Sequence, residues 1–452
     1  MSVPKVGCVG LGQVGLQTGI SLCDAGYSVR GVDLDKARVD QINRGRASFL
    51  PDQLETQLGK HTKSGRLAAA TSISFLADCD RYVVTVPTPL DEDKRPDLSS
   101  VRAAGEAIAE VLEPGDLILL QSTVPIGCCR NEFCTALEQS GFTAGTDFGI
   151  AHVPERYSPD DESSLETPRV VGAINEHWLD SAVTFYRSIG TEVVPVESLE
   201  VAEATKLTEN IQRDVNIALV NELARVFETV GVDVFDVLDA AATKWNFHRY
   251  EPHLGVGGHC LPVDPYLLLD RVEDLDENIT VVSSARSINE SMPEQYVHLL
   301  ERALRDVGRE LAHASVALLG ISYKSGVKDV RNSPAADVIR LISAAGGEVT
   351  VYDPLFDAVE SFDLPGIDVT NGASALDAAQ GTDALVLSHA TVPDPSLSQF
   401  SDVMAADPVL VDPAATFEAD LARNEGFRYQ RFGVISIEPR IGPSESEAWS
   451  ND

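Results

Sequence analysis

The sequence predicts an α/β protein with two Rossmann-like, doubly wound parallel-sheet domains joined by a central all-helical domain with a long helix. A strand, a glycine turn, a helix and a second strand follow one another over residues 5–33, and a similar alternation restarts at residue 314. Between these halves, apolar residues recur at helical spacing. The 452 residues suffice for about three domains. We place them at 1–198, 199–311 and 312–441, followed by a polar tail, 442–452, that we expect to be disordered.

The composition restricts the classes of function. A hydrophobic content of 44% supports packed cores, but no segment reaches the ~18 consecutive apolar residues of a membrane span, and no signal peptide is visible. The net charge of −35, from 70 acidic and 35 basic residues, disfavours binding to nucleic acid or to anionic membranes. We therefore expect a cytoplasmic protein. The acidic surface suggests a halophilic source, and an ordinary acidic enzyme is the alternative.

The seven cysteines do not suggest a disulfide framework, because their number is odd and the chain is long. Cys128, Cys129 and Cys134 lack a second ligand pair at zinc-site spacing. We expect these three to be small packing residues on a helix, and we predict no metal site.

The first half carries the glycine turn Gly10-Leu11-Gly12-Gln13-Val14-Gly15, between a strand at 5–10 and a helix that ends near residue 25. The glycines permit a tight turn and let backbone N–H groups at the helix N-terminus reach a pyrophosphate. The next strand, 28–32, ends at Asp33, where a carboxylate can bind ribose hydroxyls and repel a 2′-phosphate. The pattern predicts NAD, although Lys36 and Arg38 weaken the preference over NADP. A turn without cofactor is the alternative.

Three further strands of this half end in polar or proline-bearing loops. Residues 81–86 lead into Pro87-Thr88-Pro89, residues 117–121 into Ser122-Thr123-Val124-Pro125, and residues 148–152 into Val153-Pro154-Glu155. Because ligands lie outside the carboxyl ends of parallel strands, Thr123 and Glu155 are expected in the same crevice as the glycine turn. For Thr123, capping of a helix is an equally good interpretation.

The middle region reads as helices at about 199–230, 233–244 and 280–307. In the first of these, Lys206, Asn210 and Asp214 are spaced by four and share one face. Surface ion pairing would explain this spacing, but asparagine is a poor mid-helix residue and the surrounding sequence is apolar. We therefore expect a functional face.

The segment Gly255-Val256-Gly257-Gly258-His259-Cys260 presents a thiol on a glycine-rich bend, and Asp264 follows four residues later. Missing side chains let a ligand or another backbone come close. An accessible thiol of this kind is a candidate nucleophile. A tight turn with a buried cysteine is the alternative.

The second α/β half contains strands at 316–320, 348–352, 384–388 and 409–411, and a helix at 334–344. Its first loop carries Lys324, Lys328 and Arg331, in a chain with only nine lysines. We interpret these cations as an anion site for a diphosphate, and a solvated basic loop is the alternative.

Together these features resemble the UDP-glucose/GDP-mannose dehydrogenase family, the nucleotide-sugar 6-dehydrogenases. The family oxidises the C6 alcohol of a UDP-sugar to a carboxylate with two NAD. The match covers about residues 4–440 and rests on Gly10-Leu11-Gly12-Gln13-Val14-Gly15, Gln121-Ser122-Thr123-Val124-Pro125, Pro154-Glu155-Arg156, Lys206-Leu207-Thr208-Glu209-Asn210, Gly257-Gly258-His259-Cys260 and Gly320-Ile321-Ser322-Tyr323-Lys324.

The resemblance implies a role for each matching residue. Cys260 is the nucleophile, Lys206 and Asn210 stabilise the oxyanion, Thr123 and Asp264 bind or activate water, and Glu155 is the acid/base carboxylate. Arg331 and Thr88 match cofactor contacts, beside the glycine turn, Asp33 and Thr123. Arg249 resembles an arginine that reaches the substrate of a partner subunit, so a homodimer or higher homo-oligomer is expected. The implied substrate contacts are Glu155, Arg156, Lys206, Asn210, Arg249, Gly257, Tyr323 and Lys324.

Departures from the UDP-glucose branch of the family reduce the number of candidate substrates. Pro159 stands where that branch has a second glutamate, and His259 and Val263 stand near the nucleophile where it tends to have serine and lysine. Both changes favour a UDP-N-acetylhexosamine, with UDP-N-acetyl-D-mannosamine as the best candidate and UDP-glucose as the alternative. Asp160, where many relatives have glycine, is a further departure. A third hypothesis is a non-catalytic dinucleotide-binding protein with Cys260 as a redox sensor. A hydroxyacid dehydrogenase would instead need a histidine proton relay, and His259 has no evident partner carboxylate.

Overall fold

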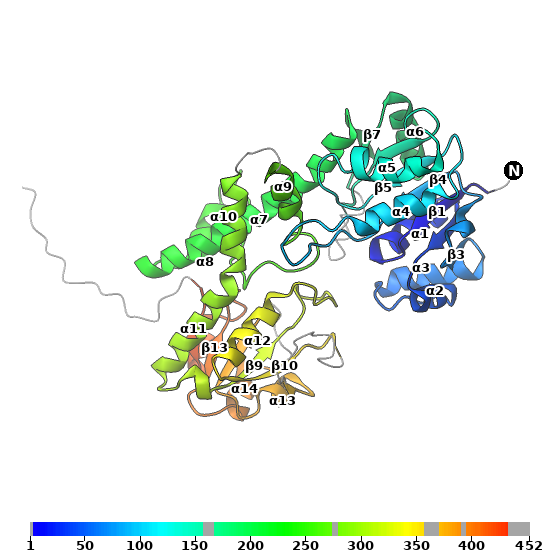
Figure 1. Cartoon of the computed structure of the whole chain (residues 1–452). Helices are drawn as coiled ribbons and strands as arrows, with labels where there is room; N and C mark the ends of the chain where they lie inside the picture. Colours follow the sequence, from blue (N-terminus) through cyan, green and yellow to red (C-terminus); the bar gives the residue numbers. More distant parts are fainter. Residues whose placement is uncertain (1–2, 157–166, 274–278, 357–369, 390–394, 433–452) are drawn as a thin grey trace, which may run out of the picture. The chain divides into compact units, whose positions relative to one another are not determined.

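The computed structural model describes residues 3–156, 167–273, 279–356, 370–389 and 395–432, so Pro159, Asp160 and the tail from 442 lie outside the described residues. The chain forms two compact units, Met1–Gln212 with Val263–Thr280, and Arg213–Pro262 with Val281–Asp452 (Figure 1). Each unit contains one largely or wholly parallel sheet with helices packed against it. The predicted fold class, two parallel-sheet α/β domains with a helical central region, is confirmed.

The first unit contains an eight-stranded sheet in the order β3-β2-β1-β4-β5-β6-β7-β8. Every neighbouring pair is parallel except β6 and β7, which are antiparallel. The strand order reverses between β1 and β4, where an open α/β sheet forms a ligand crevice. The strands are β1 (Lys5–Val9), β2 (Ser28–Val32), β3 (Leu67–Ala70), β4 (Arg81–Val84), β5 (Leu117–Leu120), β6 (Gly149–His152), β7 (Arg169–Ala173) and β8 (Val193–Pro195).

Helices cover both faces of this sheet. In β5, Leu117 and Leu119 pack into a core with helices α1, α3 and α6, whereas Ile118 and Leu120 pack into a second core with α4 and α5. Burial of both faces explains the continuous apolar runs that made these strands predictable. The helices of the first unit are α1 (Gln13–Asp24), α2 (Lys36–Asn43), α3 (Asp52–Lys63), α4 (Ser99–Ala109), α5 (Cys134–Leu137), α6 (Glu176–Ser188) and α9 (Asp264–Glu273).

The helical middle region is built mainly on α7 (Leu199–Val230), whose bounds agree with the prediction. Helix α8 (Val234–Ala242) begins after Asp233, whose carboxylate accepts a hydrogen bond from a backbone N–H of the first turn. The single helix predicted at 280–307 is wrong, because α10 (Thr280–Glu290) and α11 (Met292–Asp306) are separate. Pro293 lies in the first turn of α11, where the absence of its N–H is tolerated.

The second unit contains a six-stranded parallel sheet in the order β11-β10-β9-β12-β13-β14. Val316 and Leu318 face a core with α11 and α12, whereas Ala317 and Leu319 face a core with α13, α14 and α15. Figure 1 shows α12 beside β9 and β10. The elements are β9 (Ser315–Leu319), α12 (Pro334–Ala344), β10 (Glu348–Tyr352), β11 (Thr370–Asn371), α13 (Ala375–Ala379), β12 (Ala384–Leu387), α14 (Leu397–Val403), β13 (Val409–Val411), α15 (Ala419–Asn424) and β14 (Arg428–Gln430).

Of the seven cysteines, six are buried and only Cys260 is partly exposed. As predicted, Cys128, Cys129 and Cys134 pack into a core, and burial raises the pKa of each thiol. Within the described residues, no three His, Cys, Asp or Glu side chains come together as possible metal ligands. Across the same residues, no helix combines the length and the apolar composition needed to cross a membrane.

Candidate active site

The glycine turn of the first unit leaves open space at the N-terminus of α1. Gly10 has a φ of +87°, and a Cβ on Gly15 would lie 2.0 Å from the carbonyl oxygen of Gly10, so packing requires both glycines. A Cβ on Gly12 would meet nothing within 4 Å. Gln13 and Val14 begin α1, and no side chain caps their backbone N–H groups. This geometry fits a pyrophosphate close to the backbone at Gly12.

Asp33, at the end of β2, is held beside this turn. Its carboxylate accepts hydrogen bonds from Leu11 N (2.8 Å) and Asp35 N (2.9 Å). Arg38 Nη1 lies 3.0 Å from Asp33 Oδ2, so this cation is paired with the carboxylate. The turn, the start of α1 and Asp33 together fit an NAD molecule whose ribose hydroxyls bind the carboxylate.

The loops after β4, β5 and β6 are joined at one edge of the sheet. Thr88 Oγ1 donates to the carbonyl oxygen of Thr123 at 2.7 Å, and Ser122 Oγ donates to that of Val86 at 2.7 Å. The backbone N–H of Glu155 donates to Gln121 O at 3.4 Å. The structure thus brings Thr88, Thr123 and Glu155 to the carboxyl ends of neighbouring strands, where the sequence analysis expected them.

Glu155 forms an ion pair that the sequence analysis missed. Arg169, the first residue of β7, has Nη1 2.6 Å from Glu155 Oε1. Arg156 donates its backbone N–H to the same oxygen at 2.8 Å. The Arg156 guanidinium pairs with Glu209 of α7 at 2.7 Å. Arg169 was missed because β7 was not recognised, so nothing placed it beside a residue 14 positions earlier in the chain.

Asn210 of α7 and Asp264 at the start of α9 are buried against each other, and Lys206 of α7, which is half-buried, interacts electrostatically with Asp264. Asn210 Nδ2 donates to Asp264 Oδ2 at 2.5 Å. The Asp264 side chain belongs to a residue only 2% exposed, and burial raises its pKa to about 6, although Asn210 and Lys206 oppose the shift. A carboxyl group with a pKa near 6 can serve as a general base close to neutral pH.

In the second unit, the cysteine-bearing loop packs on the loop that follows β9. Gly258 N donates to Arg331 O at 3.0 Å. The Arg331 guanidinium pairs with Asp329 and lies 3.3 Å from His259 Nδ1. A Cβ on Gly257 would lie 2.6 Å from Tyr323 Cβ, so the glycines here allow one loop to approach another. Gly257, Cys260, Tyr323 and Arg331 therefore lie in one region of this unit.

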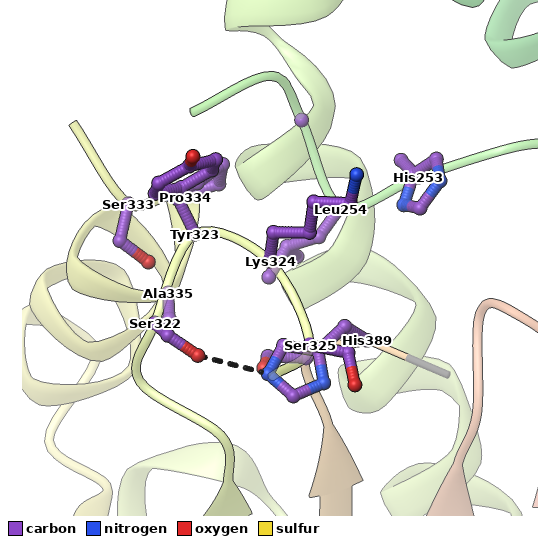
Figure 2. A pocket seen from close by; sticks show the side chains of 12 residues that line it. His253, Leu254, Ser322, Tyr323, Lys324, Ser325, Ser333, Pro334, Ala335 and His389 are labelled. Carbon is purple, nitrogen blue, oxygen red and sulfur yellow. Dashed lines mark hydrogen bonds between the residues drawn. The ribbon is translucent and has the colours of Figure 1, made fainter. Parts of the chain in front are cut away.

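A cavity of about 160 Å³ lies at the carboxyl ends of β9 and β12 (Figure 2). Figure 2 shows Ser322 facing His389, with Ser322 Oγ 3.3 Å from His389 Nε2. Burial lowers the pKa of His253 and His389, so Lys324 supplies the positive charge of the lining. Its remaining polar members are mostly serine hydroxyls, which suit phosphate or sugar oxygens.

Of the three cations predicted to form one diphosphate site, only Lys324 lines this cavity. Lys328 Nζ lies 5.7 Å from the centre of the Phe356 ring, and Arg331 pairs with Asp329. Arg249 pairs with Asp239 and Glu251 of its own chain, and about a third of its side chain is exposed.

Three family models match successive parts of the chain. The NAD binding domain of the UDP-glucose/GDP-mannose dehydrogenase family matches residues 4–190. The central domain of that family matches residues 200–291, and its UDP binding domain matches residues 317–419. The glycine turn lies in the first match, Cys260 in the second and Lys324 in the third.

Individual proteins are similar along most of the chain. A UDP-N-acetyl-D-mannosamine dehydrogenase of Pyrococcus horikoshii is 35% identical over 352 residues, 77% of this chain and 83% of that protein. A UDP-N-acetyl-D-glucosamine 6-dehydrogenase of Pseudomonas aeruginosa is 34% identical over 80% of this chain and 86% of that protein. A solved structure of a UDP-D-ManNAc dehydrogenase from Pyrococcus horikoshii superposes with a TM-score of 0.85 and 31% identity, covering 95% of this chain and 99% of that one.

Proposed function

This chain belongs to the UDP-glucose/GDP-mannose dehydrogenase family, and from that premise we propose that it oxidises the C6 alcohol of a UDP-N-acetylhexosamine to a carboxylate. It is an NAD-dependent oxidoreductase. UDP-N-acetyl-D-mannosamine is the proposed substrate, because the relative with that name is similar along most of this chain. The observation that carries the chemistry is the buried hydrogen bond between Asn210 and Asp264, near Lys206. Asp264 follows Cys260 by four residues in the chain.

NAD, when bound, accepts the hydride in both oxidations. In our proposal Gly10, Gly12, Gln13, Val14 and Gly15 hold its pyrophosphate. Asp33 binds the adenosine ribose, and Thr88 and Thr123 border the nicotinamide side of the crevice. Arg331 contributes a further contact to the cofactor. The open space at Gly12 supports this assignment.

Cys260 acts after the first oxidation has converted the C6 alcohol to an aldehyde. Its thiolate adds to C6, so that a C–S bond forms and the carbonyl oxygen becomes an oxyanion. The Lys206 ammonium and the Asn210 amide stabilise that oxyanion, and one such donor typically contributes about 10²–10³-fold in rate. Loss of a second hydride from C6 then leaves a thioester on Cys260.

Water cleaves the thioester, releasing the uronate and returning the thiol. In our proposal Asp264 and Thr123 bind and activate this water, and Glu155 exchanges the proton with the leaving group. The raised pKa of Asp264 supports a role as base near neutral pH. The Arg169 pair supports an orienting role around Glu155.

The nucleotide portion of the substrate is assigned to the cavity beside Lys324, whose ammonium would bind the diphosphate. Arg156, Gly257 and Tyr323 complete the proposed substrate contacts.

The experiment that tests the proposal measures NADH formed per mole of UDP-N-acetyl-D-mannosamine, UDP-N-acetyl-D-glucosamine and UDP-glucose at high salt. Two NADH per sugar are expected with the first substrate. Preference for UDP-glucose would refute the assignment of a UDP-N-acetylhexosamine as the substrate, and the assignment to the family would still stand.

We also infer that the protein is a homodimer, with Arg249 reaching the partner's substrate. Large apolar side chains are exposed along α7 and beyond its end, including Val226, Val230 and Trp245, of which Trp245 is 92% exposed. Apolar surface of this kind favours burial against a second copy. Trp245→Glu is expected to shift the sedimentation coefficient of the protein toward that of a monomer. An unchanged coefficient would contradict this assignment of the interface.

A further inference from the structure

The cysteine-bearing loop at residues 255–260, called the nucleophile loop here, is joined to the loop after β9 by an unusual residue, Asn332. We propose that Asn332 is a positioning residue, which fixes the nucleophile loop and thereby presents the Cys260 thiol in one place relative to the nucleotide cavity. The inference rests on the nucleophilic role proposed for Cys260. Asn332 does not itself contact the reacting atoms in this proposal.

Both backbone polar groups of Gly258 are bound by consecutive residues of the neighbouring loop. Gly258 N donates to Arg331 O at 3.0 Å, and Asn332 Nδ2 donates to Gly258 O at 2.9 Å. Two hydrogen bonds to a single residue fix its peptide planes in position and in direction. Gly258 lies two residues before Cys260, so this anchor also restricts the thiol.

Close packing between the nucleophile loop and the loop after β9 also restricts movement of the two loops against each other. A Cβ on Gly257 would lie 2.7 Å from Asn332 O, and one on Gly258 would lie 2.9 Å from the Tyr323 ring. Gly258 also has a φ of +87°, which other residues rarely adopt. Loop-on-loop packing therefore explains two of the three glycines in this loop, Gly257 and Gly258.

The backbone of Asn332 points to the importance of its side chain. Its φ is +50°, in the left-handed region that non-glycine residues seldom occupy and asparagine tolerates best. Glycine would adopt this conformation without strain but could not donate to Gly258. A residue held in a sparsely populated conformation while its side chain bridges two loops is typical of functional sites.

The upstream end of the nucleophile loop has its own anchor. His253 N donates to Asn221 Oδ1 at 2.8 Å, and Asn221 Nδ2 donates to Asn289 Oδ1 at 3.0 Å. Asn289 in turn donates to Asp214 at 2.9 Å, so the start of the loop is tied to buried groups of α7 and α10. Loss of the Asn332 bond is thus expected to release the segment near Cys260 and to leave the segment near His253 in place.

The test compares Asn332→Gly with the parent and with Asp407→Gly. Asp407 has a similar φ of +53° in the same unit, so the control relieves the same backbone strain away from the site. Alkylation of each cysteine by iodoacetamide is followed by mass spectrometry without substrate. The affinity for UDP and the kcat are measured separately.

In Asn332→Gly, alkylation of Cys260 is expected to rise about 3- to 10-fold and kcat to fall by a similar factor, the scale of one net hydrogen bond. UDP affinity should change by less than about twofold, and the six buried cysteines should stay unlabelled as in Asp407→Gly. Unchanged Cys260 alkylation, or equal labelling of all seven cysteines, would overturn the proposal. Alkylation requires no turnover, so it tests Asn332 even if the proposed reaction is wrong.

Discussion

Replacement of Asp264 by asparagine is expected to stabilise the fold while it abolishes turnover. The Asp264 residue is 2% exposed, and its pKa is raised from 3.8 to about 6, chiefly by burial. Asparagine has the same shape, and its carbonyl oxygen can still accept the hydrogen bond from Asn210. The substitution therefore removes the buried charge and keeps the neighbouring amide paired.

The expected gain depends on pH. Above pH 6 the folded protein must ionise a carboxyl group that the unfolded chain ionises more readily, a cost of about 3 kcal/mol for a shift of about two pKa units. Below about pH 3 the carboxyl is largely protonated in both states, so the cost disappears. Asp264→Asn should thus raise the free energy of unfolding by up to about 3 kcal/mol at pH 8 and by little at pH 4.

Urea denaturation at both pH values, with kcat measured on the same samples, checks this expectation. The kcat of the parent should rise with pH through about 6, since the base form of Asp264 is required, and Asp264→Asn should lose at least about 10²-fold. If Asp264→Asn changed the free energy of unfolding equally at both pH values, the cost assigned to burying the ionised Asp264 carboxylate would be refuted. A variant with the parent's kcat would refute the role of Asp264 as a base.

Two further substitutions test other parts of the site and the fold. Cys260→Ala should retain NAD binding, measured by fluorescence, and lose the double oxidation, because no thioester can form. Two NADH per sugar from that variant would end the covalent mechanism. His152 is fully buried, and burial lowers its pKa to about 3. Its stabilising contribution is therefore present above pH 6.5 and is lost as the pH falls toward 3. Relative to His152→Leu, the parent should lose about 2 kcal/mol more between pH 7 and 5 in urea denaturation. Parallel losses would show that His152 does not cause the acid sensitivity.

Patterns local in the chain determined much of the fold. The apolar run of β5, the glycine turn before α1 and the helical periodicity of the 32-residue α7 are each visible in a continuous segment of the sequence. Such features depend on backbone preferences and on alternation or periodicity of side chains, which neighbouring residues carry. For the same reason Thr123, Glu155 and Cys260 could be nominated as site residues, since each follows a strand or lies on a glycine-rich bend.

Strands without a strong local pattern were missed. β3 reads Leu-Ala-Ala-Ala, and alanine has little preference for a strand, so its pairing with β2 decides its conformation. β7 pairs antiparallel to β6, and the residues of the two strands do not indicate the relative direction of the pairing. These elements depend on hydrogen bonds to strands distant in sequence.

The tertiary structure alone decided the partners and the electrostatics of the site. It pairs Arg169 with Glu155 and buries Asp264 in a hydrogen bond with the side-chain amide of Asn210. It also joins Asn332 to Gly258 by a hydrogen bond, although these residues are 74 positions apart in the chain. The sequence determined which chemical groups this protein carries and the regular elements that hold most of them. Desolvation and hydrogen bonding depend on which distant surfaces meet, and for that reason the pKa of Asp264 and the anchoring of the thiol could be obtained only from the folded chain.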